Sequence, residues 1–179
     1  MRLIIAITGA SGAHIGMKIL ELLPKNITPY LIVSEHAKEV LKHEPVYMYD
    51  NRDISAPVAS GSFPSDAMII APCSMNTLAK ISCGIADNLV TRSASVMIKE
   101  QRRLLLAPRE MPFSAIALEN MLKLSHLGII IAPPILGYYS EQKSLDEMEN
   151  FIIGKWFDLL GIEHNLYKRW KTEEADLEN

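Results

Sequence analysis

Short apolar runs recur along the chain, and each ends in a turn and a polar residue. They cover residues 3–8, 29–34, 67–72, 104–108 and 128–133. The runs are apolar throughout and do not alternate with polar residues, which is typical of strands covered on both faces by helices. Helical patterns follow most of them, over residues 13–23, 35–43, 75–98, 114–126 and 144–160. This alternation predicts an α/β fold with a doubly wound parallel sheet.

Serines stand where four of these helices would begin, and serine is a preferred N-cap residue. They are Ser34, Ser74, Ser114 and Ser144. Residues 45–66 form the one long segment without a regular pattern, and such loops are often functional. We predict a single domain over residues 1–170, followed by a charged, frayed tail over residues 171–179.

Composition narrows the class of protein. A chain of 179 residues with 49% hydrophobic and 22% charged residues is ordinary for one soluble globular domain. A net charge of −3 without a basic block argues against a nucleic-acid partner, and no apolar run is long enough for a membrane span. Cys73 and Cys83 match no zinc or redox spacing, so a reducing cytoplasm is the expected location.

The first strand runs into the turn TGASGA, residues 8–13. Gly9 and Gly12 allow a tight turn and close approach of a ligand, and Ser11 stands at the start of a helix whose amides attract anions. A plain tight turn is the alternative. The motif is not G-x-G-x-x-G, and although Glu35 follows the second strand, a mononucleotide such as FMN fits better than a dinucleotide.

A second polar turn, PCSMNT (residues 72–77), follows the third apolar run. Ser74, Asn76 and Thr77 offer hydroxyl and amide groups at a helix N-terminus, where a flavin ring or a phosphate can be held. Ordinary capping by Ser74 is the alternative. Arg92 and Lys99 follow in the next helical pattern, where a solvated surface charge is the common fate of such residues.

The fourth apolar run ends in the sequence PRE, with Arg109 beside Glu110. Arg109 offers a planar fork suited to phosphate, and Lys99, Lys155 and Tyr139 would add charge and a hydroxyl. Adjacent residues on an extended chain point apart, which argues against a simple Arg109–Glu110 ion pair.

The sequence lacks a G-x-S-x-G elbow, a Walker loop and an H-E-x-x-H motif, so no metal site is expected. The histidines are scattered, which argues against a catalytic role for them; they are His14, His36, His43, His126 and His164.

The short motifs belong to longer sequence stretches, which follow one another along the chain in this order: ITGASGA, ASGSF, APCSMNTLAKISCGIADNLVTRSASVMIKE, PREMPFS, LENMLKL, GYY and, near the end, RW. In this order and spacing the chain resembles the UbiX-type flavin prenyltransferases, formerly described as aromatic-acid decarboxylases. The resemblance covers nearly the whole chain. It implies a flavodoxin-like, Rossmann-like fold that binds FMN and assembles into a dodecamer with active sites at subunit contacts.

The resemblance also implies a reaction. A dimethylallyl group from dimethylallyl phosphate would be joined to N5 and C6 of reduced FMN without a metal ion, and the prenylated FMN would serve UbiD-type decarboxylases. The resemblance does not distinguish a monophosphate from a diphosphate donor, and it does not identify the decarboxylase that uses the product.

Matching positions carry the family's roles to this chain. The residues implied to contact FMN are Gly9, Ala10, Ser11, Ser34, Ser74, Met75, Asn76, Thr77 and Arg92. Those implied to surround the phosphate are Lys99, Arg109, Glu110, Tyr139 and Lys155. Those implied to take part in catalysis are Ser11 and Glu110 as proton carriers, Glu44 near the reacting centre and Trp170 over the isoprenoid.

Two departures and two alternatives qualify this interpretation. Lys155 stands where many relatives carry arginine, so the charge is kept and the bidentate fork is lost. The loop before ASGSF is short. One alternative is an FMN-dependent cysteine decarboxylase, which uses a histidine in the loop before the PCSMNT-like turn; here that loop has none. The other is a flavin carrier without catalysis, against which the second set of cations argues.

Overall fold

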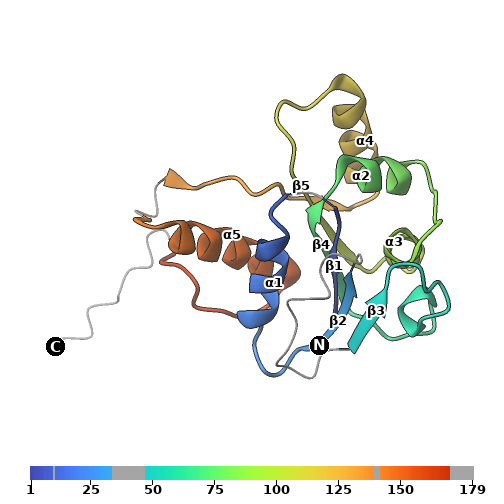
Figure 1. Ribbon diagram of the computed structural model, residues 1–179, viewed down its shortest axis with the longest axis horizontal. Coiled ribbons are helices and arrows are strands. Elements are labelled where there is room, and N and C mark those ends of the chain that lie inside the picture. The colour runs from blue at the N-terminus through green and yellow to red at the C-terminus, as the bar shows by residue number, and fades with distance from the viewer. Residues whose placement is uncertain (10, 34–46, 139–141, 170–179) are drawn as a thin grey trace. The chain divides into compact units, whose positions relative to one another are not determined.

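The computed structural model describes residues 1–9, 11–33, 47–138 and 142–169. Its contacts divide the chain into two compact units, Met1–Pro134 and Ile135–Asn179, and each is described by itself. Among the described residues, the first unit contains the sheet and four α-helices, and the second contains one long helix and the segment after it (Figure 1).

The sheet of the first unit has six parallel strands in the order β3-β2-β1-β4-β5-β6. The strands are β1 (Arg2–Ile7), β2 (Thr28–Val33), β3 (Tyr47–Asp50), β4 (Ala67–Cys73), β5 (Arg103–Pro108) and β6 (Ile130–Ile131). Without the short edge strand β3, the remaining order is that of flavodoxin-like sheets. The predicted doubly wound parallel sheet is confirmed.

Helices cover both faces of this sheet. Those of the first unit are α1 (Ala13–Glu21), α2 (Met75–Ser82), α3 (Leu89–Lys99) and α4 (Ala115–His126). Helix α1 lies on one side of the sheet and α2, α3 and α4 lie on the other (Figure 1). On the second side, Ile4, Ile70 and Leu106 of the strands share a buried cluster with Leu78 of α2 and Leu124 of α4. Burial on both faces explains why the strands read as continuous apolar runs.

Gly16 sets the close approach of α1 to the sheet. A Cβ atom at this position would lie 2.5 Å from the carbonyl oxygen of Ala71 and 2.7 Å from Cγ1 of Ile7. The first of these neighbours is backbone and cannot rotate away, so only glycine fits without moving the helix. Helix α1 therefore packs directly over β1 and β4.

Two expectations about elements are wrong. The single helix expected over residues 75–98 is broken between α2 and α3, because Gly84 has a φ of 72° and Asn88 starts a new helix through a capping box with Thr91. The segment 45–66, expected to be irregular, contains strand β3, which pairs with β2. Tyr47 and Tyr49 alternate with other residues there, but this strand pattern is too short to be recognised in the sequence.

The predicted caps are confirmed at Ser74, Ser114 and Ser144, whose hydroxyls each accept a hydrogen bond from a backbone amide of their helix. The helix expected over 35–43 and its cap Ser34 lie outside the described residues. Within the described ranges, no helix combines the length and the apolar composition that crossing a membrane requires.

The second unit is built on helix α5 (Leu145–Leu160), and the segment after it folds back along the helix. Phe151 of α5 packs edge-on against Tyr167, with ring centroids 4.9 Å apart. Asp158 holds this segment to the helix through three contacts. It accepts hydrogen bonds from the hydroxyl of Tyr167 and, at 2.7 Å, from Nη2 of Arg169. Its Oδ1 also lies 3.1 Å from Nε2 of His164. A single carboxylate therefore fixes residues 164–169 to the helix.

The ionised form of this carboxylate is strongly favoured. Burial by itself would raise the pKa of Asp158, but hydrogen bonds from Arg169 and Tyr167 and the charge of Arg169 outweigh it and lower the pKa from 3.8 to about 2. Because the folded-state pKa lies below the unfolded value, its contribution to stability is complete above pH 4 and is lost as the pH falls toward 2.

We expect Asp158→Asn to lower the free energy of unfolding by about 1 kcal/mol at neutral pH, since three donors lose their charged acceptor. Urea titrations of both proteins at several pH values measure this difference. The difference should shrink as the pH approaches 3, where the wild-type carboxylate begins to protonate. A difference that stayed constant from neutral to acid pH would contradict the role of the charge.

Candidate functional site

The switch point of the sheet lies at the carboxyl ends of β1 and β4. The chain leaves β1 toward β2 and leaves β4 toward β5, so a crevice opens between the two strand ends. Thr8 joins them: its hydroxyl donates to the carbonyl oxygen of Pro72 at 2.8 Å and accepts from the amide of Ser74 at 2.8 Å. The turns TGASGA and PCSMNT, noted in the sequence, are therefore brought together.

The turn after β1 is open toward this crevice. A Cβ atom at Gly9 would meet no atom of the described residues within 4 Å, so space remains beside the backbone. Gly12 has a φ of 97° and is the N-cap of α1, and no side chain caps that helix. The other described α-helices are each capped by a serine or asparagine side chain. Helix α1 thus begins without a side-chain cap, and the positive end of its dipole suits the phosphate of a mononucleotide.

The turn after β4 is more occupied than the sequence suggested. The hydroxyl of Ser74 accepts from the amide of Thr77 at 3.2 Å and donates to the hydroxyl of Thr77 at 2.9 Å. Ser74 therefore acts as the helix cap of the simpler interpretation. The Thr77 hydroxyl keeps its own hydrogen to donate, Asn76 is exposed, and Met75 packs partly against the core.

Arg109 reaches the same place from β5. Its amide donates to the carbonyl oxygen of Cys73 at 3.4 Å. Its Cδ lies 4.0 Å from the position that a Cβ on Gly12 would take, so the side chain passes over the turn after β1. Glu110 follows, exposed, and accepts a hydrogen bond from the amide of Met111 at 3.0 Å. An exposed guanidinium thus lies beside the uncapped start of α1, at the crevice, where an anionic ligand would sit.

Arg92 and Lys99 lie on α3, Arg92 near the end at the carboxyl edge of the sheet and Lys99 at the opposite end. They are seven residues apart on α3, which places them on one side of the helix, and both are exposed. Helix α3 starts at the carboxyl end of β3, where its first amides donate to Asn51, and it ends before the amino end of β5. Lys99 and Arg109 are therefore separated by the length of β5, roughly 20 Å. Within one chain the structure does not bring these two predicted phosphate ligands together.

The surroundings of Lys99 are well defined. Its Nζ donates to the carboxylate of Glu100, and this hydrogen bond lowers the pKa of Glu100. A Cβ at Gly61 would lie 2.6 Å from the same Nζ, so the ASGSF loop has no room for a side chain at this position. Arg102 fixes the loop by donating to the carbonyl oxygens of Gly61 and Phe63, both at 2.7 Å.

Thr8, Gly61 and Arg102 were not predicted as site residues, although each supports a part of the site. Thr8 had a sequence signal, since it is a hydroxyl residue at the end of an otherwise apolar strand. Arg102 had none, because the loop groups to which its guanidinium donates are 37 to 41 residues away along the chain. Its role depends on a loop whose path the sequence does not indicate.

Of the remaining predicted residues, the structure describes Ser11 and Lys155. Ser11 is exposed in the turn before α1. Lys155 belongs to the second unit, where its Nζ lies 3.9 Å from Oδ2 of Asp158. Five others lie outside the described residues: Ala10, Ser34, Glu44, Tyr139 and Trp170.

Neither a thiol nor a metal is indicated at the crevice. Cys73 lies at the end of β4, but burial raises the pKa of its thiol to about 12, so it is no nucleophile at neutral pH. Over the described ranges, no group of three His, Cys, Asp or Glu side chains is placed to hold a metal ion.

Comparisons with known proteins agree over nearly the whole chain. The family model described as Flavoprotein matches residues 1–155. The flavin prenyltransferase UbiX of Helicobacter pylori is 47% identical over 184 residues, covering 95% of this chain and 98% of its own.

Solved structures that are similar to this one include two with clear sequence identity. The dodecameric FMN-dependent UbiX-like decarboxylase from Escherichia coli O157:H7 has a TM-score of 0.88 at 38% identity and covers 96% of this chain and 100% of its own. AnUbiX (PadA1), in complex with FMN and dimethylallyl pyrophosphate, has a TM-score of 0.87 at 39% identity and covers 94% of this chain and 96% of its own.

Proposed function

The chain belongs to the UbiX flavin prenyltransferase family, and from this premise we propose how its residues perform that reaction. The protein is an enzyme that transfers a dimethylallyl group from dimethylallyl phosphate to reduced FMN, giving prenylated FMN for UbiD-type decarboxylases. The observation that carries the proposal is the crevice at the switch point, where the uncapped start of α1 lies beside the guanidinium of Arg109.

The residues of the crevice fit FMN. Reduced FMN supplies the electron-rich N5 and C6 atoms to which the dimethylallyl group becomes bonded. The open side of Gly9 leaves room for a flat ring, and the uncapped start of α1, with Ser11, suits its phosphate. Thr77 offers a hydroxyl donor from the opposite strand end. Ala10, Ser34, Ser74, Met75, Asn76 and Arg92 complete the proposed contacts.

Arg109 is the proposed ligand of the donor's phosphate. When the allylic carbon–oxygen bond breaks, the leaving phosphate gains negative charge, and a fixed guanidinium stabilises that charge more than it stabilises the bound donor. The dimethylallyl fragment becomes cation-like, and the aromatic Trp170 is proposed to cover it. Glu110, with Ser11, is proposed to accept the proton released at C6 and pass it to the phosphate, and Glu44 is proposed to lie near the reacting centre.

Lys99 joins this site only if it comes from another copy of the chain. The length of β5 separates it from Arg109 within one chain, yet the family motif makes both of them phosphate ligands. A homo-oligomer, proposed to be a dodecamer like the E. coli relative, resolves the conflict because α3 of one copy can lie against the strand ends of its neighbour. Tyr139 and Lys155 are proposed to complete the phosphate site.

A cytoplasmic location is proposed, supported by two cysteines that are both free. The cysteine decarboxylase alternative is weakened by the described loop over residues 57–66, which contains no histidine.

The proposal is tested by mixing the purified protein anaerobically with reduced FMN and dimethylallyl monophosphate, followed by mass spectrometry of the extracted flavin. A flavin heavier by one C5H8 unit is expected. A parallel reaction with the diphosphate identifies the preferred donor. If both donors returned unmodified FMN, the transferase function would be refuted and a flavin carrier would remain.

A further inference from the structure

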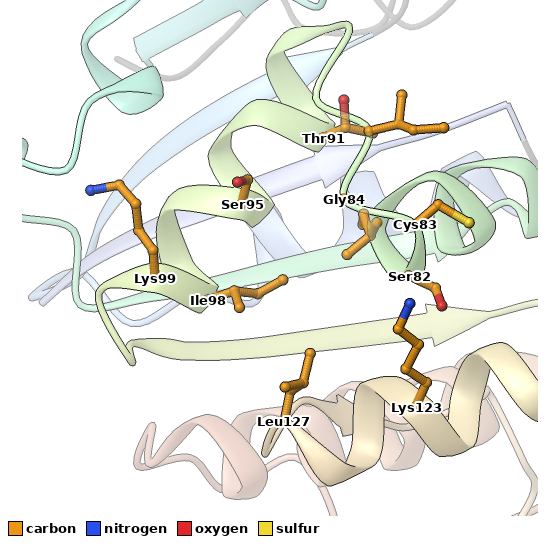
Figure 2. Close-up of a pocket in the computed structure, with 11 residues that line it drawn as sticks. Ser82, Cys83, Gly84, Thr91, Ser95, Ile98, Lys99, Lys123 and Leu127 are labelled. Carbon is orange, nitrogen blue, oxygen red and sulfur yellow. The ribbon is translucent and has the colours of Figure 1, made fainter.

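A pocket of about 340 Å³ lies between α2, α3 and α4 of the first unit (Figure 2). Its apolar lining comes from Ile81, Ile85, Ile98 and Leu127. Lys99 and Lys123 stand at opposite sides of it (Figure 2), and none of its lining residues is acidic. The pocket is therefore apolar inside, with Lys123 at one side and Lys99, whose Nζ is paired with Glu100, at the other.

Two of the four apolar residues that line this pocket are exposed to solvent. Ile85 is 46% exposed and Leu127 is 58% exposed. A hollow with an exposed apolar lining and charged sides is typical of a surface that receives a partner. Because Lys99 is one of its lining residues, the pocket adjoins the part of α3 that the proposed function assigns to a neighbouring copy.

Met111 is the counterpart on the other side of such a contact. It is 90% exposed, the most exposed of the large apolar residues in the described chain, and it stands two residues after Arg109. Methionine is flexible and polarisable, so it fills irregular apolar pockets well.

We propose that Met111 of one copy inserts into the pocket between α2, α3 and α4 of its neighbour, anchoring the contact that forms the shared active site. The inference rests on the proposed function, in which one phosphate is bound by Arg109 of one copy and Lys99 of the next. Two cations on one phosphate lie within roughly 7 Å of each other. Met111 lies two residues, at most about 7 Å, along the chain from Arg109, so a neighbour whose Lys99 meets Arg109 at the phosphate also brings its pocket toward Met111.

A native cysteine allows a direct test. Cys83 is exposed and lines the pocket, while Cys73 is buried and unreactive. The assembled oligomer of Met111→Cys is treated with a short bismaleimide. We expect a gel band at twice the chain mass. The band should be lost when Cys83→Ser is added. Ile54→Cys, at a position 62% exposed in the segment after β3, is the matched control and should give no such band.

A second measurement does not depend on crosslinking. Met111→Glu should shift the oligomer toward smaller species by native mass spectrometry, whereas Met111→Leu should keep its size. Circular dichroism verifies that both variants are folded, which we expect because the side chain is exposed in the single chain. A band that persisted with Cys83→Ser, the absence of any band, or a Met111→Glu oligomer of wild-type size would each overturn the inference.

Failure of the inference and failure of the proposed function are distinguishable. Wild-type protein that prenylates FMN while Met111→Cys fails to crosslink would keep the function and remove this contact. Wild-type protein that leaves FMN unmodified while the Cys83-dependent band forms would keep the contact and remove the function.

Discussion

Arg109→Ala is expected to lower the rate of prenyl transfer by about 10²-fold or more while FMN still binds. The guanidinium is proposed to hold a phosphate whose charge grows as the allylic bond breaks, and the loss of one such donor at a developing anion has effects of this size. The fold should be unaffected, because the Arg109 side chain is exposed and its backbone amide, which donates to Cys73, is kept. Anaerobic single-turnover assays with mass spectrometry measure the rate, and flavin absorbance measures binding.

Two further variants sharpen this prediction. Arg109→Lys keeps the charge and loses the bidentate fork, so it should recover only part of the rate. Arg52→Ala removes an arginine whose side chain is 74% exposed and paired with Asp50, and it should retain the wild-type rate. Arg109→Ala with a wild-type rate, or with lost FMN binding as its main defect, would contradict a role at the donor's phosphate.

Mixed oligomers of Lys99→Ala and Arg109→Ala chains are expected to be far more active than either variant alone. A site that takes Lys99 from one copy and Arg109 from the next is intact when an Arg109→Ala chain supplies the lysine and a Lys99→Ala chain supplies the arginine. Random assembly in equal amounts makes about one quarter of such sites intact. Coexpression with two affinity tags, followed by the prenyl-transfer assay, measures the recovered rate.

The control for this experiment uses a chain that carries both substitutions. Coexpressed with wild type in equal amounts, it should also leave about one quarter of the sites intact, instead of the half expected for sites contained in single chains. If the mixture of single variants were as inactive as its parents, the two residues would not meet across copies.

The strands and the position of the crevice were predictable from the sequence, because covered parallel strands read as apolar runs and each run ends in a polar turn. The caps Ser74, Ser114 and Ser144 were predictable for a similar reason, since capping is a local interaction. The break between α2 and α3 had a local signal in Gly84, but the apolar pattern continues on both sides of it and concealed the interruption.

What the sequence did not reveal depends on contacts between distant residues. Arg102 holds a loop that it meets only in the folded chain, and Asp158 collects donors from a segment that folds back along α5. The family motif predicted Lys99 and Arg109 as ligands of one phosphate. A sequence motif carries no information on the distance that β5 puts between them. Their separation within one chain follows from the position of β5 between them, which only the three-dimensional structure provides.

The length of β5 has a consequence for newly synthesised protein. In the proposed arrangement, a chain that has just folded carries both halves of a phosphate site but no complete one, so it must find its neighbours before it can act. Specific activity should therefore depend on protein concentration, falling on dilution below the level at which copies associate. Allylic cation chemistry would then stay confined to assembled particles, where the reactive fragment is enclosed, and isolated chains would leave the donor intact.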